Sequence, residues 1–344
     1  MNRRQFLQAC FALGGVTCLP SFVMAGSKRD LLVTTGTSNA ASAGIRRIIS
    51  AGGPADLLLM SLCPDKLLGY ANISPQALVA AGFMPQRYQK PKLGRLSGKN
   101  TQLSLEALLQ LQPDLVVDCG TVNTTYRSLA ERLTAQTGIA CVLVDGQLSD
   151  TPTQYRQLGA LIGEHPRAEF LASKAEQILS QATQFSRQQY GRRFYFARGA
   201  NGLETGTAGS IHTQAVELLG LENVVSAEGF HGLGKVSLEQ IIAWQPDCII
   251  AQDPQFIRDM QHHPLWQSLP AVKQGQFFAF PQRPFGWLDF PPGINRLLGL
   301  QLLQSYLING AAIQPATVSL IQTFMQDFFQ TDLSLQQTAQ LLDA

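Results

Sequence analysis

The sequence predicts an α/β protein with two lobes, each a parallel sheet covered by helices, joined by one long helix. Strand-like and helix-like segments alternate along the chain, and one helix–strand motif occurs twice. Residues 104–117 read SLEALLQLQPDLVV, and residues 237–250 read SLEQIIAWQPDCII. In each copy a Ser is placed to cap the helix, a Glu follows at its positive end, and a Pro ends it before the strand. The repeat indicates that one α/β unit is present twice.

The composition favours two folded domains and excludes a nucleic-acid-binding protein. The 344 residues are 45% hydrophobic and 15% charged, which is typical of a chain with large cores. The formal net charge of +2 becomes 0 if Arg3 and Arg4 are removed with an N-terminal signal. A neutral protein has no overall attraction for nucleic acid or for an anionic membrane.

Residues 1–25 have the pattern of an export signal. The pair Arg3–Arg4 precedes an uncharged apolar stretch that ends in Val-Met-Ala, a small-residue cleavage site at Ala25. The stretch is too short and too interrupted by Gly and Pro to span a membrane. The segment NRRQFL is similar to a twin-arginine signal, and a general secretory signal is the alternative. Both predict export.

The first lobe is expected at residues 26–164. Its continuous apolar strands indicate a parallel sheet with helices on both faces. The expected elements are a buried strand at Leu57–Leu62, a helix at 74–83, the first motif copy at 104–117, a helix at 125–138 and a strand at 139–145.

A long helix is expected to join the lobes within residues 165–190, preceded by a loop that holds His165. No Gly or Pro interrupts residues 167–189, and apolar residues recur there at helical spacing. These residues are Phe170, Leu171, Ala175, Ile178, Leu179, Ala182 and Phe185. The second lobe, at 191–344, repeats the alternation and is expected to end in a helix that starts near 293.

Four cysteines follow the signal, and none forms a CxxC pair. Cys63, Cys119, Cys141 and Cys248 all lie in or beside apolar runs, so we expect small buried side chains. In an oxidising compartment, a Cys63–Cys119 disulfide is an alternative to two free thiols.

With two lobes, one long joining helix and SLE…QPD in each lobe, the chain resembles the periplasmic binding proteins of iron-chelate and vitamin B12 ABC importers. The resemblance covers roughly residues 50–306. It implies Rossmann-like lobes, a ligand cleft between them, a periplasmic location, a monomer, and no cofactor other than the transported metal chelate. It also implies that Glu106 and Glu239 dock into arginine pockets of a two-subunit permease.

The resemblance places ligand contacts in the loops at the strand ends of both lobes. An arginine in a Gly-Arg context contacts the chelate in ferric-hydroxamate binders, and Arg95 matches it. Leu233 stands where B12 binders carry a tryptophan, which weakens the cobalamin reading. Trp287 is the strongest single candidate, because aromatic residues in a Pro/Gly-bounded loop usually mark recognition. The candidate ligand contacts are Arg95, Asn123, Tyr126, Arg198, His212, His231, Arg283, Phe285 and Trp287.

Several ligands remain open at this stage. A free-ion site needs three or four converging His, Cys or carboxylate groups, and only His212 and His231 are placed to approach the cleft. Arginines and aromatics favour an iron chelate, with cobalamin, haem, a nickel chelate and an oxyanion such as molybdate as alternatives. A secreted α/β enzyme using Cys119, or Ser210 with His212, is disfavoured because no G-x-S-x-G or phosphate-binding loop is present.

Overall fold

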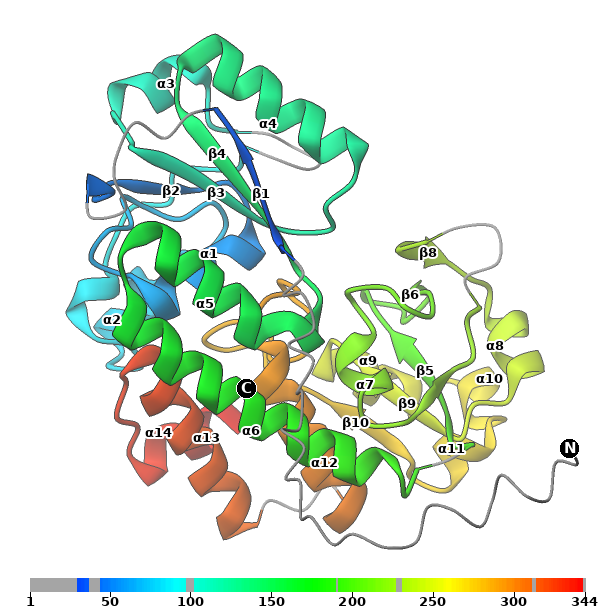
Figure 1. The fold of residues 1–344 in the computed structure, drawn as a ribbon. Coiled ribbons are helices and arrows are strands. Elements are labelled where there is room, and N and C mark those ends of the chain that lie inside the picture. Colours follow the sequence, from blue (N-terminus) through cyan, green and yellow to red (C-terminus); the bar gives the residue numbers. More distant parts are fainter. Residues whose placement is uncertain are drawn as a thin grey trace, which may run out of the picture. The chain divides into compact units, whose positions relative to one another are not determined.

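The computed structural model describes residues 30–36, 44–96, 102–189, 191–226, 231–310 and 314–342. The expected export signal lies outside the described residues. Leu31–Ala344 forms one compact unit, which contains two four-stranded sheets and a small two-stranded sheet (Figure 1). The predicted α/β class is confirmed.

The first sheet has the order β1 (Leu32–Thr35), β4 (Ala140–Asp145), β3 (Leu115–Gly120), β2 (Ile48–Ser50). Strands β2, β3 and β4 are parallel, and β1 is an antiparallel edge strand. Because side chains alternate across a strand, Val116 and Cys141 pack beneath α3 (Leu105–Gln110) and α4 (Thr124–Thr137). Val117 and Val142 pack on the other face, with α1 (Gly53–Leu62) and α5 (Thr151–Ile162). The sheet is therefore covered on both faces, as predicted.

Leu57–Leu62 is the end of helix α1, so its prediction as a strand was wrong. Pro54 stands at the helix start, and every residue from Ala55 to Leu62 is buried. A helix buried on all sides reads as a continuous apolar run, and periodicity cannot distinguish such a run from a buried strand. Asp56, also buried, accepts hydrogen bonds from the backbone N–H groups of residues 71, 72 and 73.

The long helix is confirmed as α6 (His165–Ser186), whose buried stripe includes Leu171, Ala175 and Phe185. The helix begins at His165, so the prediction that this residue lies in a loop before the helix was wrong. Helix α5, which was not predicted, precedes it and packs closely against it. A Cβ atom added at Gly159 of α5 would lie 2.2 Å from Ala168 Cβ of α6.

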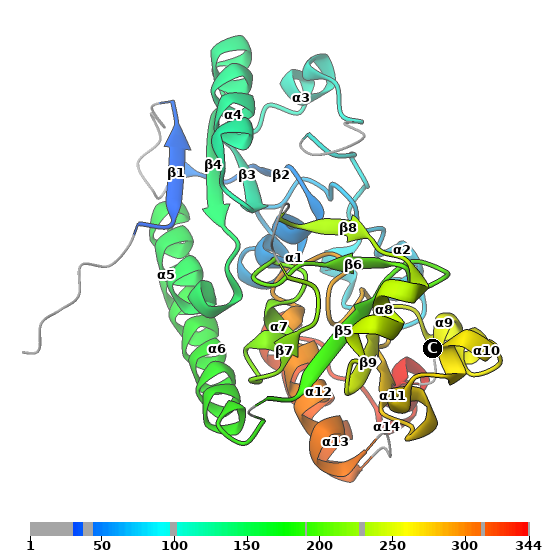
Figure 2. The same ribbon diagram turned by 90° about the vertical axis from the view of Figure 1, so that its right-hand side faces the viewer.

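The second sheet has the order β10 (Phe277–Ala279), β9 (Cys248–Ala251), β5 (Arg193–Ala197), β7 (Glu222–Asn223), and all its pairings are parallel. One face packs on four helices: α8 (Leu238–Trp244), α9 (Pro254–Met260), α10 (Pro264–Gln267) and α11 (Pro270–Lys273). The other face shares a core with α6, α7 (Gln214–Glu217) and α12 (Arg296–Asn309) (Figure 2). Strands β6 (Glu204–Gly206) and β8 (Leu233–Lys235) form a small antiparallel pair that adjoins the carboxyl end of β5.

The two motif copies have matching local structures. Ser104 caps α3 and Ser237 caps α8, each by accepting a backbone N–H of the first turn. After each helix a glutamine adopts a left-handed conformation, Gln112 with φ 45° and Gln245 with φ 47°. The following prolines then lead into β3 and β9, as the sequence predicted.

Each motif is also tied to the start of the strand that neighbours its own strand in the sheet, β2 for the first copy and β5 for the second, by an arginine and an aspartate. Asp114 accepts the backbone N–H of Arg47 at 2.9 Å, and Asp247 accepts that of Arg193 at 2.7 Å. In return the Arg47 guanidinium donates to the carbonyl of Leu111, and that of Arg193 to the carbonyl of Trp244. This reciprocal clamp fixes the end of each motif helix to its own sheet.

Two helices at the C-terminus were not predicted: α13 (Pro315–Phe329) and α14 (Leu335–Leu342). They return to the first half of the chain, where Tyr88 Oη donates to the Phe329 carbonyl at 2.7 Å. Gln337 likewise donates to the carbonyl of Gly82, next to the predicted helix that is observed as α2 (Gln76–Ala80). The C-terminal part of the range 191–344 therefore contacts residues of the first lobe.

The contact between α5 and α6 predicts a position-specific loss of stability. Gly159→Val places side-chain atoms where Ala168 already lies, so we expect the free energy of unfolding to fall by about 1–3 kcal/mol. Ala160→Val is the matched control, because Ala160 is the exposed neighbour on the same helix and bears only the small helix-propensity penalty of valine. Urea denaturation of both variants measures this, and equal losses would contradict the packing argument.

Candidate functional site

The first group of predicted ligand contacts lies at the carboxyl edge of the first sheet. Arg95 is half-buried and its Nε atom is buried without a hydrogen-bond partner. The next residue, Leu96, donates its backbone N–H to Ala51, just beyond β2. Asn123 follows β3 and caps α4 by accepting the N–H of Tyr126. The structure therefore brings the N-terminal candidates to one edge, where α/β proteins bind ligands.

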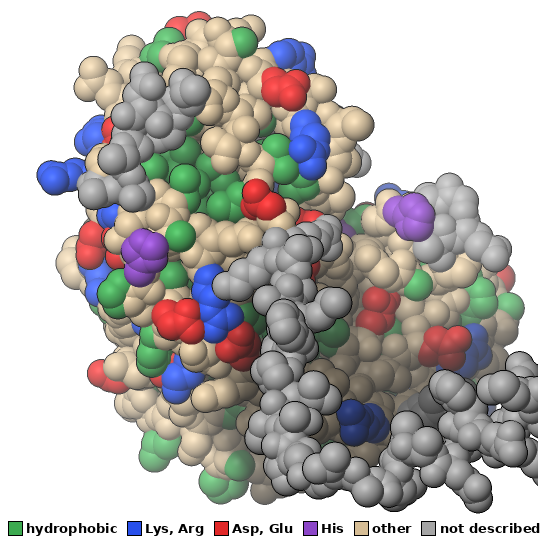
Figure 3. Space-filling model, in the orientation of Figure 1, with side chains coloured by type: hydrophobic (Ala, Val, Ile, Leu, Met, Phe, Trp, Pro, Cys, Tyr) green, Lys and Arg blue, Asp and Glu red, His purple; other side chains and the backbone are tan. Residues whose placement is uncertain are grey.

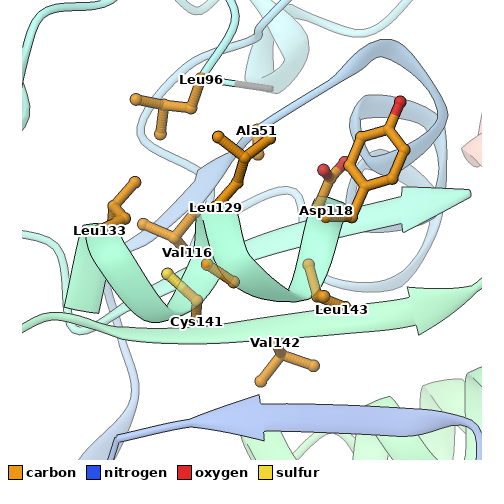
Figure 4. A pocket seen from close by; sticks show the side chains of 11 residues that line it. Ala51, Leu96, Val116, Asp118, Leu129, Leu133, Cys141, Val142 and Leu143 are labelled. Atoms are coloured by element: carbon orange, nitrogen blue, oxygen red, sulfur yellow. The ribbon is translucent and has the colours of Figure 1, made fainter. Parts of the chain in front are cut away.

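A cavity of about 30 Å³ lies between α4 and the face of the sheet that it covers (Figure 4). It is lined by apolar side chains of β3, β4 and α4, together with Leu96, Tyr126 and Asp118. Its volume is sufficient for a water molecule but not for a chelate. Tyr126 therefore lies partly in the sheet–helix layer, and only its outer part is available to a ligand.

In the second lobe Arg198 and His212 meet at a residue that sequence reasoning did not select, Asp289. The Arg198 Nε atom lies 2.6 Å from Asp289 Oδ2, a close ion pair that is not aligned as a hydrogen bond. The His212 Nδ1 atom is hydrogen-bonded to Asp289 Oδ1. The Asp289 side chain is fully buried, whereas that of His212 is 17% exposed. The available signal was an aspartate within an apolar, proline-rich stretch, WLDFPP, because an aspartate that is buried there requires partners.

Arg296 joins this group to the first sheet. It is buried, and its Nη atoms donate to the carbonyls of Gly146, which follows β4, and Ile211, which precedes His212. Nη1 also donates to Gln214. Burial lowers the pKa of Arg296 to about 10, while the charge of Asp289 acts in the opposite direction. The His212 loop is thus held beside the carboxyl end of β4.

The prediction that Trp287 and Phe285 are accessible to a ligand was wrong. Trp287 is fully buried, with its Nε1 donating to the carbonyl of Arg283, and Phe285 is 5% exposed. The Phe285 ring packs 5.0 Å from that of Phe329 in α13, a helix that was not predicted. Phe290, which follows Asp289 in the chain, is by contrast 58% exposed.

The remaining candidates lie at the surface. Arg283 is exposed, and its guanidinium makes no hydrogen bond with a described residue. His231 is exposed in the segment that leads into β8, and Leu233 of that strand is 46% exposed. The structure does not bring His231 into the Asp289 cluster.

The Gly-rich loop at 206–213 directs its backbone N–H groups inward. Those of Thr207 and Ala208 donate to backbone carbonyls of the same lobe. The N–H of Gly209 and the hydroxyl of Thr213 both donate to the carboxyl group of Glu217. Burial raises the pKa of Glu217. The N–H groups of residues 207–209 therefore already have internal acceptors, so they do not form a free cradle for an oxyanion.

The cysteines and the Ser–His pair lack the features of a nucleophilic site. All four described cysteines are free, including Cys63 and Cys119. Burial raises the pKa of Cys119 to about 12, which keeps it a thiol. The Ser210 hydroxyl accepts the backbone N–H of His212 rather than facing its ring.

Glu106 and Glu239 occupy equivalent positions in the first turns of α3 and α8. Both side chains are exposed. Hydrogen bonds from each residue's own backbone N–H and from the capping serine lower the pKa of both carboxyl groups. Each carboxylate is thus ionised and available to an external arginine.

The face of the molecule drawn in Figure 3 shows no large patch of one charge. On the face in Figure 3, Lys and Arg side chains are interspersed with Asp and Glu. Within the described ranges, no three His, Cys, Asp or Glu residues gather as a metal site, and no helix is long and apolar enough to cross a membrane.

Comparison with known proteins agrees with this geometry. Residues 83–284 match the family described as periplasmic binding protein. The Fe(3+) dicitrate-binding periplasmic protein FecB of Escherichia coli is 28% identical over 239 residues, which cover 65% of this chain and 75% of FecB. An ABC transporter solute binding protein from Sulfurospirillum deleyianum is 25% identical, with a TM-score of 0.76 over 87% of this chain and 94% of its own.

The vitamin B12 binding protein BtuF of Vibrio cholerae shares the fold at 19% identity, with a TM-score of 0.60 over 78% of this chain and 99% of its own. FecB and BtuF are periplasmic binding proteins, and the Sulfurospirillum deleyianum protein is a solute binding protein of an ABC transporter. With more than half of its length matched by the family, the chain belongs to the periplasmic binding proteins.

Proposed function

We propose that this protein captures an anionic metal chelate, of the ferric hydroxycarboxylate or siderophore class, and delivers it as a monomer to a two-subunit ABC permease. The observation that carries the delivery role is the repeated Ser-capped glutamate, present once in each lobe. A permease built from two equivalent subunits presents two equivalent docking sites. Glu106 and Glu239 provide one carboxylate for each of these sites.

The charged groups at the strand ends support a chelate rather than a bare ion. No cluster of three or more metal-ligating side chains exists in the described part of the chain, so the ion must bring its own ligands. The guanidinium groups of Arg95 and Arg283 retain unused donors, and guanidinium groups match carboxylate and hydroxamate oxygens well. The relative FecB is an Fe(3+) dicitrate-binding protein, and dicitrate presents carboxylate oxygens of this kind.

A binding titration tests the ligand class. We expect calorimetry with ferric dicitrate to give saturable binding, and Arg95→Gln to weaken it about 10- to 100-fold, because a charge-assisted hydrogen bond is lost. Arg127→Gln, at an exposed arginine of α4, is the control that retains affinity. Haem, cobalamin, nickel–histidine and molybdate complete the panel. Saturable binding of molybdate alone would contradict the chelate proposal.

The docking role predicts a separation of transport from binding. Glu106→Gln with Glu239→Gln removes both charges but leaves the Ser caps and the strand ends, so uptake should fall at least tenfold while ligand affinity stays unchanged. Uptake of the radiolabelled chelate by cells, together with calorimetry on the purified variant, measures both properties. Glu131→Gln, at an exposed glutamate on α4, is the matched control. Unaltered uptake by the double variant would exclude these docking sites.

Export through the twin-arginine route, with cleavage near Ala25, is part of the same proposal. Arg3→Lys with Arg4→Lys keeps the charge of the N-terminal region but removes the arginine pair that this route recognises. We expect the precursor to accumulate in the cytoplasm, measured by fractionation and by the N-terminal sequence of the periplasmic form. Normal export of this variant would assign the signal to the general secretory route.

A further inference from the structure

Asp289 is a buried carboxylate that two groups share. Arg198 faces one of its oxygens at 2.6 Å, and His212 Nδ1 is hydrogen-bonded to the other. Arg198 is itself only 7% exposed. Because the guanidinium already balances the charge of Asp289, the imidazole can be neutral and donate its Nδ1–H to the carboxylate.

This arrangement fixes the role of the second ring nitrogen of His212. With the proton on Nδ1, Nε2 carries a lone pair. Nε2 forms no hydrogen bond with a described residue and is not among the buried side-chain atoms that lack a partner, and the side chain is 17% exposed. An imidazole whose Nδ1–H is held by a carboxylate is the usual form of a metal-ligating histidine, because the carboxylate sets both its orientation and its basicity.

The position of the dyad suits a ligand held at the strand ends. Arg296 links the carbonyl before His212 to Gly146 at the end of β4, so the ring is carried at the junction of the two sheets. The residue that follows Asp289 is Phe290, whose side chain is 58% exposed.

We infer that His212 supplies one nitrogen ligand, through Nε2, to the metal ion of the bound chelate, with Asp289 and Arg198 as positioning residues. The inference rests on the proposed function and narrows its substrate class. The cargo is then a transition-metal complex that leaves a coordination position open or exchangeable, such as a ferric complex of a hydroxycarboxylate. A coordinatively saturated chelate would gain nothing from His212.

The test uses the full mature chain with two probes, ferric citrate for affinity and copper(II) citrate for spectroscopy. Electron spin-echo modulation of bound copper detects the remote nitrogen of a coordinated imidazole. We expect this signal in the wild type, its loss in His212→Gln, and its retention in His262→Gln, a control at an exposed histidine outside the candidate site. The affinity for ferric citrate should fall about 10- to 100-fold in His212→Gln, and about tenfold or more in Asp289→Asn.

A second measurement is independent of any ligand and of variants that fail to fold. Nitrogen-15 NMR of the ligand-free wild type should show His212 as the Nδ1–H tautomer, and an Nε2–H tautomer would overturn the inference. If His212→Gln still bound copper(II) citrate and still showed the imidazole signal, the inference would also be overturned. The proposed function would then remain in place. Failure of the wild type to bind either citrate complex would count against the ferric hydroxycarboxylate class and hence against this narrowing.

Discussion

The buried guanidinium of Arg296 is the interaction on which the junction of the two sheets depends. It donates hydrogen bonds to Gly146, at the carboxyl end of β4 in the first sheet, and to Ile211 and Gln214 in the second lobe. These acceptors are uncharged, and burial of a cation is tolerable here because its hydrogen bonds are satisfied. Gln214 also donates to Gln147 and accepts the N–H of Leu148. The loops that carry the candidate ligand contacts are therefore fixed to one another rather than placed independently.

The duplicated motif solves the same mechanical problem twice. A short helix that presents one carboxylate is marginally stable by itself, so each copy is capped by a serine at its start and clamped by an arginine at its end. The reciprocal aspartate joins the same arginine's backbone to the motif. A displacement of Glu106 or Glu239 is therefore transmitted to the sheet of the same lobe. The position of each glutamate thus follows the position of its lobe.

Charge is distributed differently inside the site and at its surface. Arg198 and Asp289 neutralise each other in the interior, and Glu217 is satisfied by the Gly-rich loop. Arg95 and Arg283 keep unused donors at the strand ends. Of these two arginines, Arg283 is exposed and Arg95 is half-buried, whereas the paired interior charges orient neighbouring groups and would be costly to separate.

The sequence by itself determined the α/β class, the duplicated motif with its caps, and helix α6, because these depend on local capping chemistry and on periodicity over many residues. Only the tertiary structure decided which side chains are exposed. Leu57–Leu62 is a helix because its surroundings bury every side of it, and Trp287 and Phe285 are inside because α12 and α13 cover their loop. Phe290 is left outside by the same packing. Asp289 could not be chosen from the sequence because its partners, Arg198 and His212, lie far away along the chain, and only the packing of distant segments sets their contact.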